Sequence, residues 1–428
     1  MTARYDRLAP LESPERERAF PGWAVLRDLD GNERDADAAR RARLRFLCIR
    51  PVYRLAVQGF AGVDADSFDR QIERVREELG HLPARDQERS ALASMLNEVR
   101  SREPQQVIPA LLAVSEFADA NGYFSASQEY ARLALDLARR SRQDRLAISA
   151  TRALSRAALN SGRLEQADAY AQQACDMALS ADDRGEWIRS IGQLAATYRG
   201  TGDPAEAREA LLQALKRARD WGNDALIGLA FLQLCRHSAE SGAPERVIEY
   251  GWSALKVLER NEDRALVLTL MGGALSAVGL QHAADRCYTL VTLHAATPAL
   301  RVAGLAGTAL VAAESGDRDG YRERRSATIR ELGPAHRAAR AAAHLELGRA
   351  ALVLGDQETA REHLRETFSL LGTFSSTPTR ARAEEFHRTL ERREVAGSPR
   401  TDAGTAAPEA RRIAAELEHM ADSLVLAD

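Results

Sequence analysis

Apolar side chains recur along most of the chain at spacings of three and four residues, which is the pattern of amphipathic helices. The segment 64–79 carries one such stripe, at spacings of 4, 3 and 4 residues: Phe68, Ile72, Val75 and Leu79. Almost no segment shows the alternation of apolar and polar residues that is typical of a β-strand. The pattern therefore predicts an all-α protein.

A repeat becomes visible when seven glycines are aligned. They recur at successive intervals of 40, 40, 40, 37, 37 and 39: Gly122, Gly162, Gly202, Gly242, Gly279, Gly316 and Gly355. Each lies in a short polar segment between two helical patterns, and glycine suits such a place because helices often end in a left-handed residue. Pro204 and Pro244 follow two residues after a glycine, which fits the first turn of the next helix. We therefore expect seven pairs of helices, each with a glycine in its turn.

The flanks of the glycines repeat as well. Seven residues before each glycine the side chain is small: Ser115, Ser155, Ala195, Cys235, Gly272, Ala309 and Gly348. Five residues after it stand Ser127, Ala167, Ala207, Val247, Ala284, Tyr321 and Ala360, and twelve after it the first four copies have alanine. Small residues on two successive helices let their backbones approach closely, so each unit is expected to be an antiparallel helix pair stacked on the next. Tyr321 and Thr328 replace small residues in the sixth copy, which we expect to pack differently.

This pattern resembles the tetratricopeptide repeat over roughly residues 104–372. The resemblance implies a right-handed α-solenoid of about seven helix pairs, over an array that we place at residues 104–377. The family's repeat is about 34 residues long. The turn glycines here recur at intervals near 40, and this longer period predicts longer helices. The proline that usually closes the second helix is absent from the early copies.

Two segments precede the array. Residues 1–35 are rich in charge, proline and glycine, and we expect them to be poorly ordered. Residues 36–103 are expected to form capping helices. The first of these, over 36–62, is rich in arginine and contains Pro51, which should kink or divide it. Residues 64–101 are expected to form a degenerate helix pair that covers the first repeat.

Three segments follow the array. Residues 378–396 predict a highly charged helix, and 397–408 have the composition of a linker. Residues 409–428 predict an amphipathic helix with one apolar stripe: Ile413, Leu417, Met420 and Leu424. Because a lone helix must bury such a stripe, three outcomes are open. The helix docks on the last repeat, enters the groove of its own or another copy, or binds a partner.

Composition narrows the class of protein. The 62 acidic and 59 basic residues nearly cancel, so nothing in the net charge favours nucleic acid or a membrane surface as a partner. Only Lys216 and Lys256 are lysine, which indicates a GC-rich bacterial genome. The four cysteines are scattered without a CxxC motif, and no secretory signal or membrane span is visible. We therefore expect a cytoplasmic protein.

A search for catalytic and metal motifs leaves little. There is no P-loop, no strand followed by GxGxxG and no GxSxG motif. Glu384 with His387 and Glu416 with His419 have ExxH spacing, but the further glutamates that a metal-binding helical bundle needs are missing. We expect no enzymatic activity, no cofactor and no metal.

The concave face of a stacked helix-pair array is the better candidate site, because the first helix of each pair lines it. By analogy with similar repeats, residues three, six, ten and thirteen before each turn glycine should face this groove. The candidate partner-binding residues at or beside these places are Glu116, Asp119, Arg152, Arg156, Asn160, Arg189, Arg199 and Arg236. From the fifth copy onward the same places are mostly small or apolar: Thr269, Gly273, Ser276, Ala306 and Leu310.

Arginines in a concave surface offer forked donors to carboxylates, so we expect the groove to bind an acidic or C-terminal peptide segment. The alternative is that these arginines pair with acids on neighbouring helices. Together these features predict a non-enzymatic, regulatory scaffold that binds a protein or peptide. Two other functions are open, namely a peptide-sensing receptor of the bacterial repeat type and an accessory subunit that controls an enzyme or a nucleic-acid effector.

Overall fold

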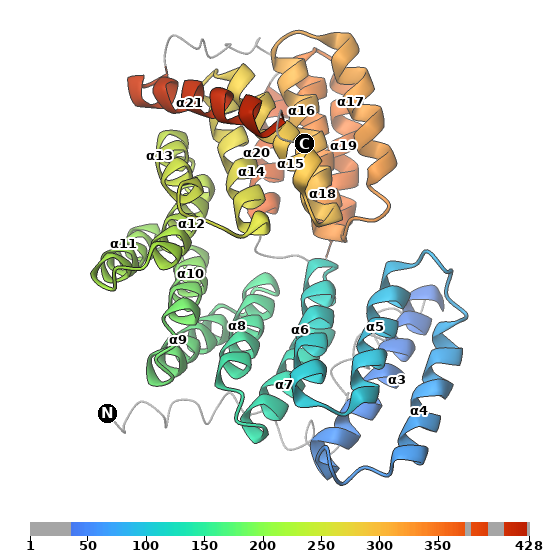
Figure 1. Cartoon of the computed structure of the whole chain (residues 1–428). Coiled ribbons are helices and arrows are strands. Elements are labelled where there is room, and N and C mark those ends of the chain that lie inside the picture. Colours follow the sequence, from blue (N-terminus) through green and yellow to red (C-terminus); the bar gives the residue numbers. More distant parts are fainter. Residues whose placement is uncertain (1–35, 373–377, 393–405, 426–428) are drawn as a thin grey trace. The chain divides into compact units, whose positions relative to one another are not determined.

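The structure is a computed structural model that describes residues 36–372, 378–392 and 406–425, the last stretch with side chains as far as His419. These residues form helices joined by short turns, and no strand occurs among them (Figure 1). The chain divides into two compact units, with the boundary between Thr197 and Tyr198 inside one helix. The predicted all-α class is confirmed.

Unit 1 contains three helices before the repeats and the repeat helices up to the boundary. Their bounds are α3 Ala36–Gln58, α4 Ala65–Leu79, α5 Gln87–Ser101, α6 Pro104–Ala120, α7 Phe124–Arg140, α8 Asp144–Asn160, α9 Leu164–Ser180 and α10 Arg184–Gly200, the last of which crosses into unit 2.

Unit 2 continues with α11 Pro204–Asp220, α12 Asp224–Glu240, α13 Pro244–Leu255, α14 Asn261–Ala277, α15 Gln281–His294, α16 Pro298–Glu314, α17 Arg318–Glu331, α18 Arg337–Val353, α19 Gln357–Leu371, α20 Pro378–Arg392 and α21 Pro408–Val425. Even-numbered helices from α6 to α18 are the first helices of the pairs, and odd-numbered helices from α7 to α19 are the second.

The early repeats have a strict register. The helices α6 to α12 each contain 17 residues, and they begin at positions 104, 124, 144, 164, 184, 204 and 224. All seven turn glycines have a positive φ, between 67° and 94°, a conformation that glycine adopts without a Cβ clash. The turns between pairs are left-handed too, at Arg102, Arg142, Asp182 and Gly222, which recur with the period of the first glycines. Each helix pair of the early repeats is therefore built from two similar units, and each unit is one helix followed by one left-handed turn.

Small buried residues hold the two helices of a pair together. The seven residues that precede each turn glycine by seven positions are buried. In two copies a serine there donates a hydrogen bond across the pair, Ser115 Oγ to the Ser127 carbonyl at 2.9 Å and Ser155 Oγ to the Ala167 carbonyl at 2.7 Å. Cys235 Sγ lies 3.6 Å from the Val247 carbonyl at the same place. The predicted close crossing is confirmed.

The three helices before the repeats pack against the first repeat helices of unit 1. The helix α4 buries the four apolar residues of its predicted stripe, and the side chain of Asp64 caps its first turn. The helix α3 contacts α4, α5 and α7 and shares their core. Pro51 does not divide α3, which continues unbroken to Gln58, so that part of the expectation is wrong. Because proline removes only one backbone donor, the packing of α3 on α4, α5 and α7 can offset the loss.

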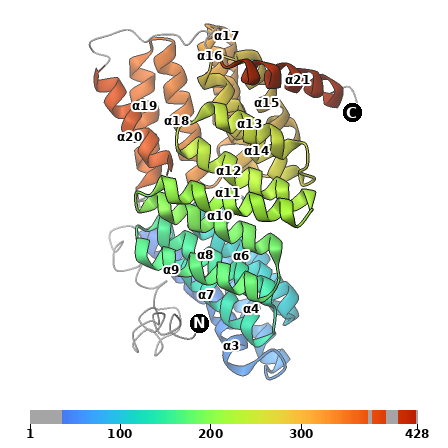
Figure 2. The same ribbon diagram turned by 90° about the vertical axis from the view of Figure 1, so that its left-hand side faces the viewer.

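The end of unit 2 departs from the register. The second helices α13, α15, α17 and α19 contain only 12 to 15 residues, while the first helices keep 17. In the sixth copy α17 makes few contacts with α18, and α18 packs along α16 instead. After the seventh copy α20 lies alongside α19 and also contacts α18 (Figure 2). The sixth copy thus packs differently, as the residues at its small-residue positions predict.

Candidate functional site

The predicted groove residues of the first two copies form one polar group in unit 1. Asp119, on α6, is buried and accepts a hydrogen bond from Arg156 Nε at 2.9 Å. It also accepts from Asn160 Nδ2, at 3.0 and 3.1 Å to its two carboxylate oxygens. Glu116 is exposed, with a carboxylate oxygen 4.0 Å from Arg156 Nη1. A buried acid on one first helix thus holds two donors on the next.

A second buried acid, Glu186 on α10, holds two more of the predicted arginines. Arg152 approaches one of its carboxylate oxygens with Nε at 3.2 Å and Nη2 at 2.9 Å. Arg189 donates from Nη1 to the other oxygen at 3.1 Å, and Ser149 adds a hydroxyl contact at 3.3 Å. Glu186 is only 4% exposed, whereas the two arginine side chains are about one-fifth to one-quarter exposed (21% and 24%). Its carboxylate therefore fixes both guanidinium groups at the surface.

The electrostatics of this arginine cluster, defined as Arg152, Arg156 and Arg189, reflect burial. Burial raises the pKa of Asp119 despite the opposing charge of Arg156. Burial also lowers the pKa of Arg152, against the attraction of Glu186. Two buried carboxylates, Asp119 and Glu186, and the exposed Glu116 thus lie beside the three guanidinium groups.

The two remaining predicted arginines lie in unit 2 and differ from each other. Arg199, near the end of α10, forms an ion pair with Glu240 of α12, and its Nη1 lies 3.4 Å from His237 Nδ1. Burial and the neighbouring arginines, Arg199 first, lower the pKa of His237 to about 4, so this histidine is neutral near pH 7. Arg236 is exposed and has no ion pair or hydrogen bond within the described ranges.

The expected apolar far part of the groove is wrong in two places. Ala306 and Leu310 are buried, at 0% and 3% exposure, inside the helix packing of unit 2. Ser276 instead contacts the carboxylate of Glu314, so α14 and α16 are joined by a polar contact. A further acid, Glu346 of α18, pairs with Arg349 at 2.8 Å and with Arg382 of α20.

The C-terminal helix has docked on its own chain. In unit 2, α21 lies across α13 and α15, the second helices of copies four and five (Figure 1). Ile413 and Leu417 are each 1% exposed and share a core with these helices, and Glu418 accepts from His282 Nδ1 at 2.9 Å. Of the three outcomes left open, the helix docks on its own chain, on copies four and five and not on the last repeat. Met420 and Leu424 are outside the described side chains.

Sequence reasoning missed the acids that hold the arginines. Glu186 stands in the first turn of α10 and Glu240 at the end of α12, both outside the positions counted from the turn glycines. The one signal that could have indicated these acids is a glutamate at a helix position where the neighbouring positions are buried or half-buried. The pairing corresponds to the alternative left open above, in which arginines bond to acids of neighbouring helices.

The histidine, acidic and cysteine side chains singled out in the sequence lie apart from one another or in other pairings. No group of three histidine, cysteine, aspartate or glutamate residues lies close enough there to hold a metal ion. His387 contacts Glu391, and Glu416 contacts Arg412, so neither ExxH pair is set up as a ligand pair. The four cysteines are free and buried, and burial raises the pKa of each thiol. No helix in the described ranges is long and apolar enough to cross a membrane.

Comparison with known proteins agrees with this architecture. The sequence model of the tetratricopeptide repeat family matches residues 188–220, which contain α11 and most of α10. A search of curated proteins found no match to the chain. With its repeated helix pairs, the chain is a tetratricopeptide-like helical-repeat protein.

Three solved structures are similar to this chain at low identity. The apo form of RapI is 11% identical, with a TM-score of 0.45, over 76% of this chain and 97% of that one. A Rap protein complexed with competence and sporulation factor is 11% identical, with a TM-score of 0.35, over 87% and 99%. The anaphase-promoting-complex heterotetramer Cut9–Hcn1 is 13% identical, with a TM-score of 0.42, over 83% and 63%. These likenesses are too distant to transfer a partner or an activity.

Proposed function

We propose that the chain is a non-enzymatic scaffold whose unit 1 binds a protein or peptide segment on the first helices α6, α8 and α10. Stacked helix pairs offer an extended surface for such a segment. The observation that carries the proposal is the arginine cluster, in which buried Asp119 and Glu186 orient guanidinium groups at the surface. Carboxylates of an acidic side chain or a chain end are the partner chemistry that this cluster fits best.

The ion pairs with Asp119 and Glu186 use only some of the N–H donors of these arginines. Each guanidinium has five N–H donors, and the acids use Nε of Arg156, Nε and Nη2 of Arg152, and Nη1 of Arg189. The other N–H groups have no hydrogen-bond partner within the described part of the chain. Because the acids already fix the side-chain rotamers, a partner loses less conformational entropy on binding. The cluster is therefore prepared for a ligand and also stabilises the fold.

A peptide-selection experiment tests the proposal. Peptides are selected from a random library on the full chain, and their affinities are measured by calorimetry at two salt concentrations. We expect acidic peptides whose affinity falls about tenfold for Arg156→Lys with Arg189→Lys, because lysine keeps the charge but loses the forked geometry. Arg139→Lys, on the exposed face of α7, is the matched control and should change affinity by less than about twofold. Equal affinity for the double variant and the wild type would refute this site.

A further inference from the structure

The sixth copy of the repeat, in unit 2, departs from the pattern of small residues at the helix crossings, and the proposed scaffold function does not explain this departure. In six of the seven copies the residue five places after the turn glycine is serine, alanine or valine. In the sixth copy this residue is Tyr321, which is 7% exposed. A tyrosine fills far more space than an alanine. The helix α17 packs on α16, its partner in the pair, but makes few contacts with α18 of the next pair. Tyr321 thus lies on a second helix that stacks loosely on the following pair.

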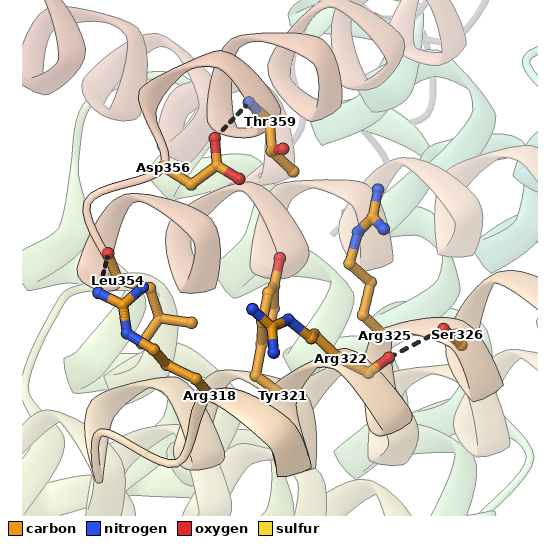
Figure 3. A pocket seen from close by; sticks show the side chains of 8 residues that line it. All are labelled: Arg318, Tyr321, Arg322, Arg325, Ser326, Leu354, Asp356 and Thr359. Carbon is orange, nitrogen blue, oxygen red and sulfur yellow. Dashed lines mark hydrogen bonds between the residues drawn. The ribbon is translucent and has the colours of Figure 1, made fainter.

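A pocket of about 310 Å³ lies beside this tyrosine, between α17 and the start of α19. Three arginines, Arg318, Arg322 and Arg325, stand on α17 at spacings of 4 and 3 residues, which places them on one face of the helix. Figure 3 shows these side chains and Tyr321 rising from α17 toward the segment that carries Leu354, Asp356 and Thr359. The pocket therefore concentrates positive charge from one helix.

These arginines, unlike those of unit 1, pair with no buried acid among the described residues. Arg318 Nη2 donates to the Leu354 carbonyl at 3.1 Å, and Arg322 pairs with Asp319, whose side chain is 92% exposed. Arg325 Nε donates to His363 Nε2 at 3.2 Å. Burial, with the adjacent His344 and Arg325, lowers the pKa of His363 to about 4, so its ring is neutral near pH 7. This histidine therefore does not offset the positive charge of Arg325, which acts on Asp356 instead.

The aspartate that lines the pocket, Asp356, already accepts a hydrogen bond from the backbone of α19. Asp356 Oδ1 accepts the Thr359 backbone N–H at 3.1 Å and so caps the first turn of α19. This bond lowers the pKa of Asp356, which stays ionised. Three arginines against Asp356 and the exposed Asp319 leave the pocket with an excess of positive charge. An anionic ligand is therefore the kind that this pocket favours.

The hydroxyl of Tyr321 lacks a hydrogen-bond partner in the described ranges, which is a second, independent indication that a ligand binds here. Its oxygen is shielded from water and has no hydrogen-bond partner among the described residues, although buried hydroxyls are nearly always paired. It belongs to a side chain that is more than nine-tenths buried and stands among the three arginines in Figure 3. A tetrahedral oxyanion offers enough acceptor oxygens for several guanidinium groups and this hydroxyl together, whereas one carboxylate offers two.

We propose that the pocket formed by Arg318, Tyr321, Arg322, Arg325 and Thr359 binds a phosphate monoester dianion. The ester belongs either to a small metabolite or to a phosphorylated side chain of a partner, since both present the same group. This site lies on second helices of unit 2 and uses none of the residues of the arginine cluster. Its success or failure is therefore separate from that of the proposed function.

Calorimetry on the full chain at low ionic strength tests the proposal with inorganic phosphate as the probe. We expect saturable binding that Tyr321→Phe weakens about tenfold, because a hydrogen bond to a charged acceptor is lost. Arg322→Gln should weaken it by about tenfold or more. Arg330→Gln, which removes the same charge from an exposed place on α17 outside the pocket, should change it by less than about twofold. Thermal unfolding of each variant checks that unit 2 remains folded.

Two outcomes overturn the proposal, namely no heat of binding for the wild type, or equal losses for Arg330→Gln and Arg322→Gln, which would show unspecific attraction to a basic helix. Retention of full affinity by Tyr321→Phe and Arg322→Gln together also overturns it. A second titration, with a phosphoserine peptide and its unphosphorylated form, separates the sources. Binding of the phosphopeptide at least about tenfold tighter than phosphate assigns the site to a modified partner, and equal binding assigns it to a small ester.

Discussion

Arginines of the same chain serve two different ends in its two units. On α8 and α10 of unit 1 each arginine of the cluster bonds to a buried carboxylate, Asp119 or Glu186. On α17 of unit 2 the arginines face a carbonyl, an exposed aspartate and a neutral histidine. The comparison teaches that a buried acid fixes the rotamer of an arginine and offsets part of its charge, so that the arginine both stabilises the fold and presents its remaining donors, whereas an arginine without one keeps its whole charge for a ligand.

The largest effect is expected where a buried acid is removed. Glu186→Ala leaves Arg152 and Arg189 without their partner and should lower the free energy of unfolding of unit 1 by about 3 kcal/mol. Glu116→Ala, at a side chain that is 72% exposed, should stay within about 0.5 kcal/mol. Urea unfolding followed by circular dichroism measures both. Equal effects of the two variants would break the distinction between buried and exposed acids.

A smaller effect on the free energy of unfolding is expected from the titration of His363, the neutral partner of Arg325. The folded-state pKa of His363 is about 4 and its ordinary value is 6.5, so the unfolded chain binds the proton more readily between these values. The free energy of unfolding of unit 2 should therefore fall as the pH falls from 6.5 to 4, by about 2 kcal/mol for this residue. His363→Gln should reduce that slope and leave the part due to His237, whereas His294→Gln, at an exposed position, should not. A slope unchanged by His363→Gln contradicts a neutral ring.

The smallest effect is expected from the pocket arginines themselves. Arg318→Gln and Arg322→Gln should change the free energy of unfolding of unit 2 by less than about 0.5 kcal/mol each, because neither holds a buried charge. Thermal unfolding without phosphate measures this, and added phosphate should raise the melting temperature of the wild type alone. A loss of about 2 kcal/mol or more in either variant, the size typical of a disrupted buried network, would show that these arginines are structural and would remove the contrast with unit 1.

Much of the fold was predictable because it rests on local chemistry. The seven turn glycines were identified from spacing alone, and all of them have the left-handed backbone that their turns need. The stripe of α4 and the small residues of the helix crossings were predictable for the same reason, since periodicity records burial directly. Left-handed turns between pairs were not predicted, because Arg102, Arg142 and Asp182 occupy them in place of glycine.

Contacts between distant residues could not be predicted in the same way. The stripe of α21 shows that it must be buried, but nothing in it specifies α13 and α15 as the place. The partners of the arginines, Glu186 and Glu240, depend on which first helices lie side by side and at what height. The exception at Tyr321 was visible in the sequence, yet the pocket beside it required the placement of α17 and α19.

A double-mutant cycle between Arg152 and Glu186 tests the account most directly. The free energies of unfolding of Arg152→Gln, Glu186→Gln and the combined variant, compared with the wild type, isolate the interaction between the two side chains. We predict a coupling energy of about 2 kcal/mol, since both charges are largely shielded from water. A coupling energy below about 0.3 kcal/mol would contradict the claim that the buried carboxylate holds the arginine in place.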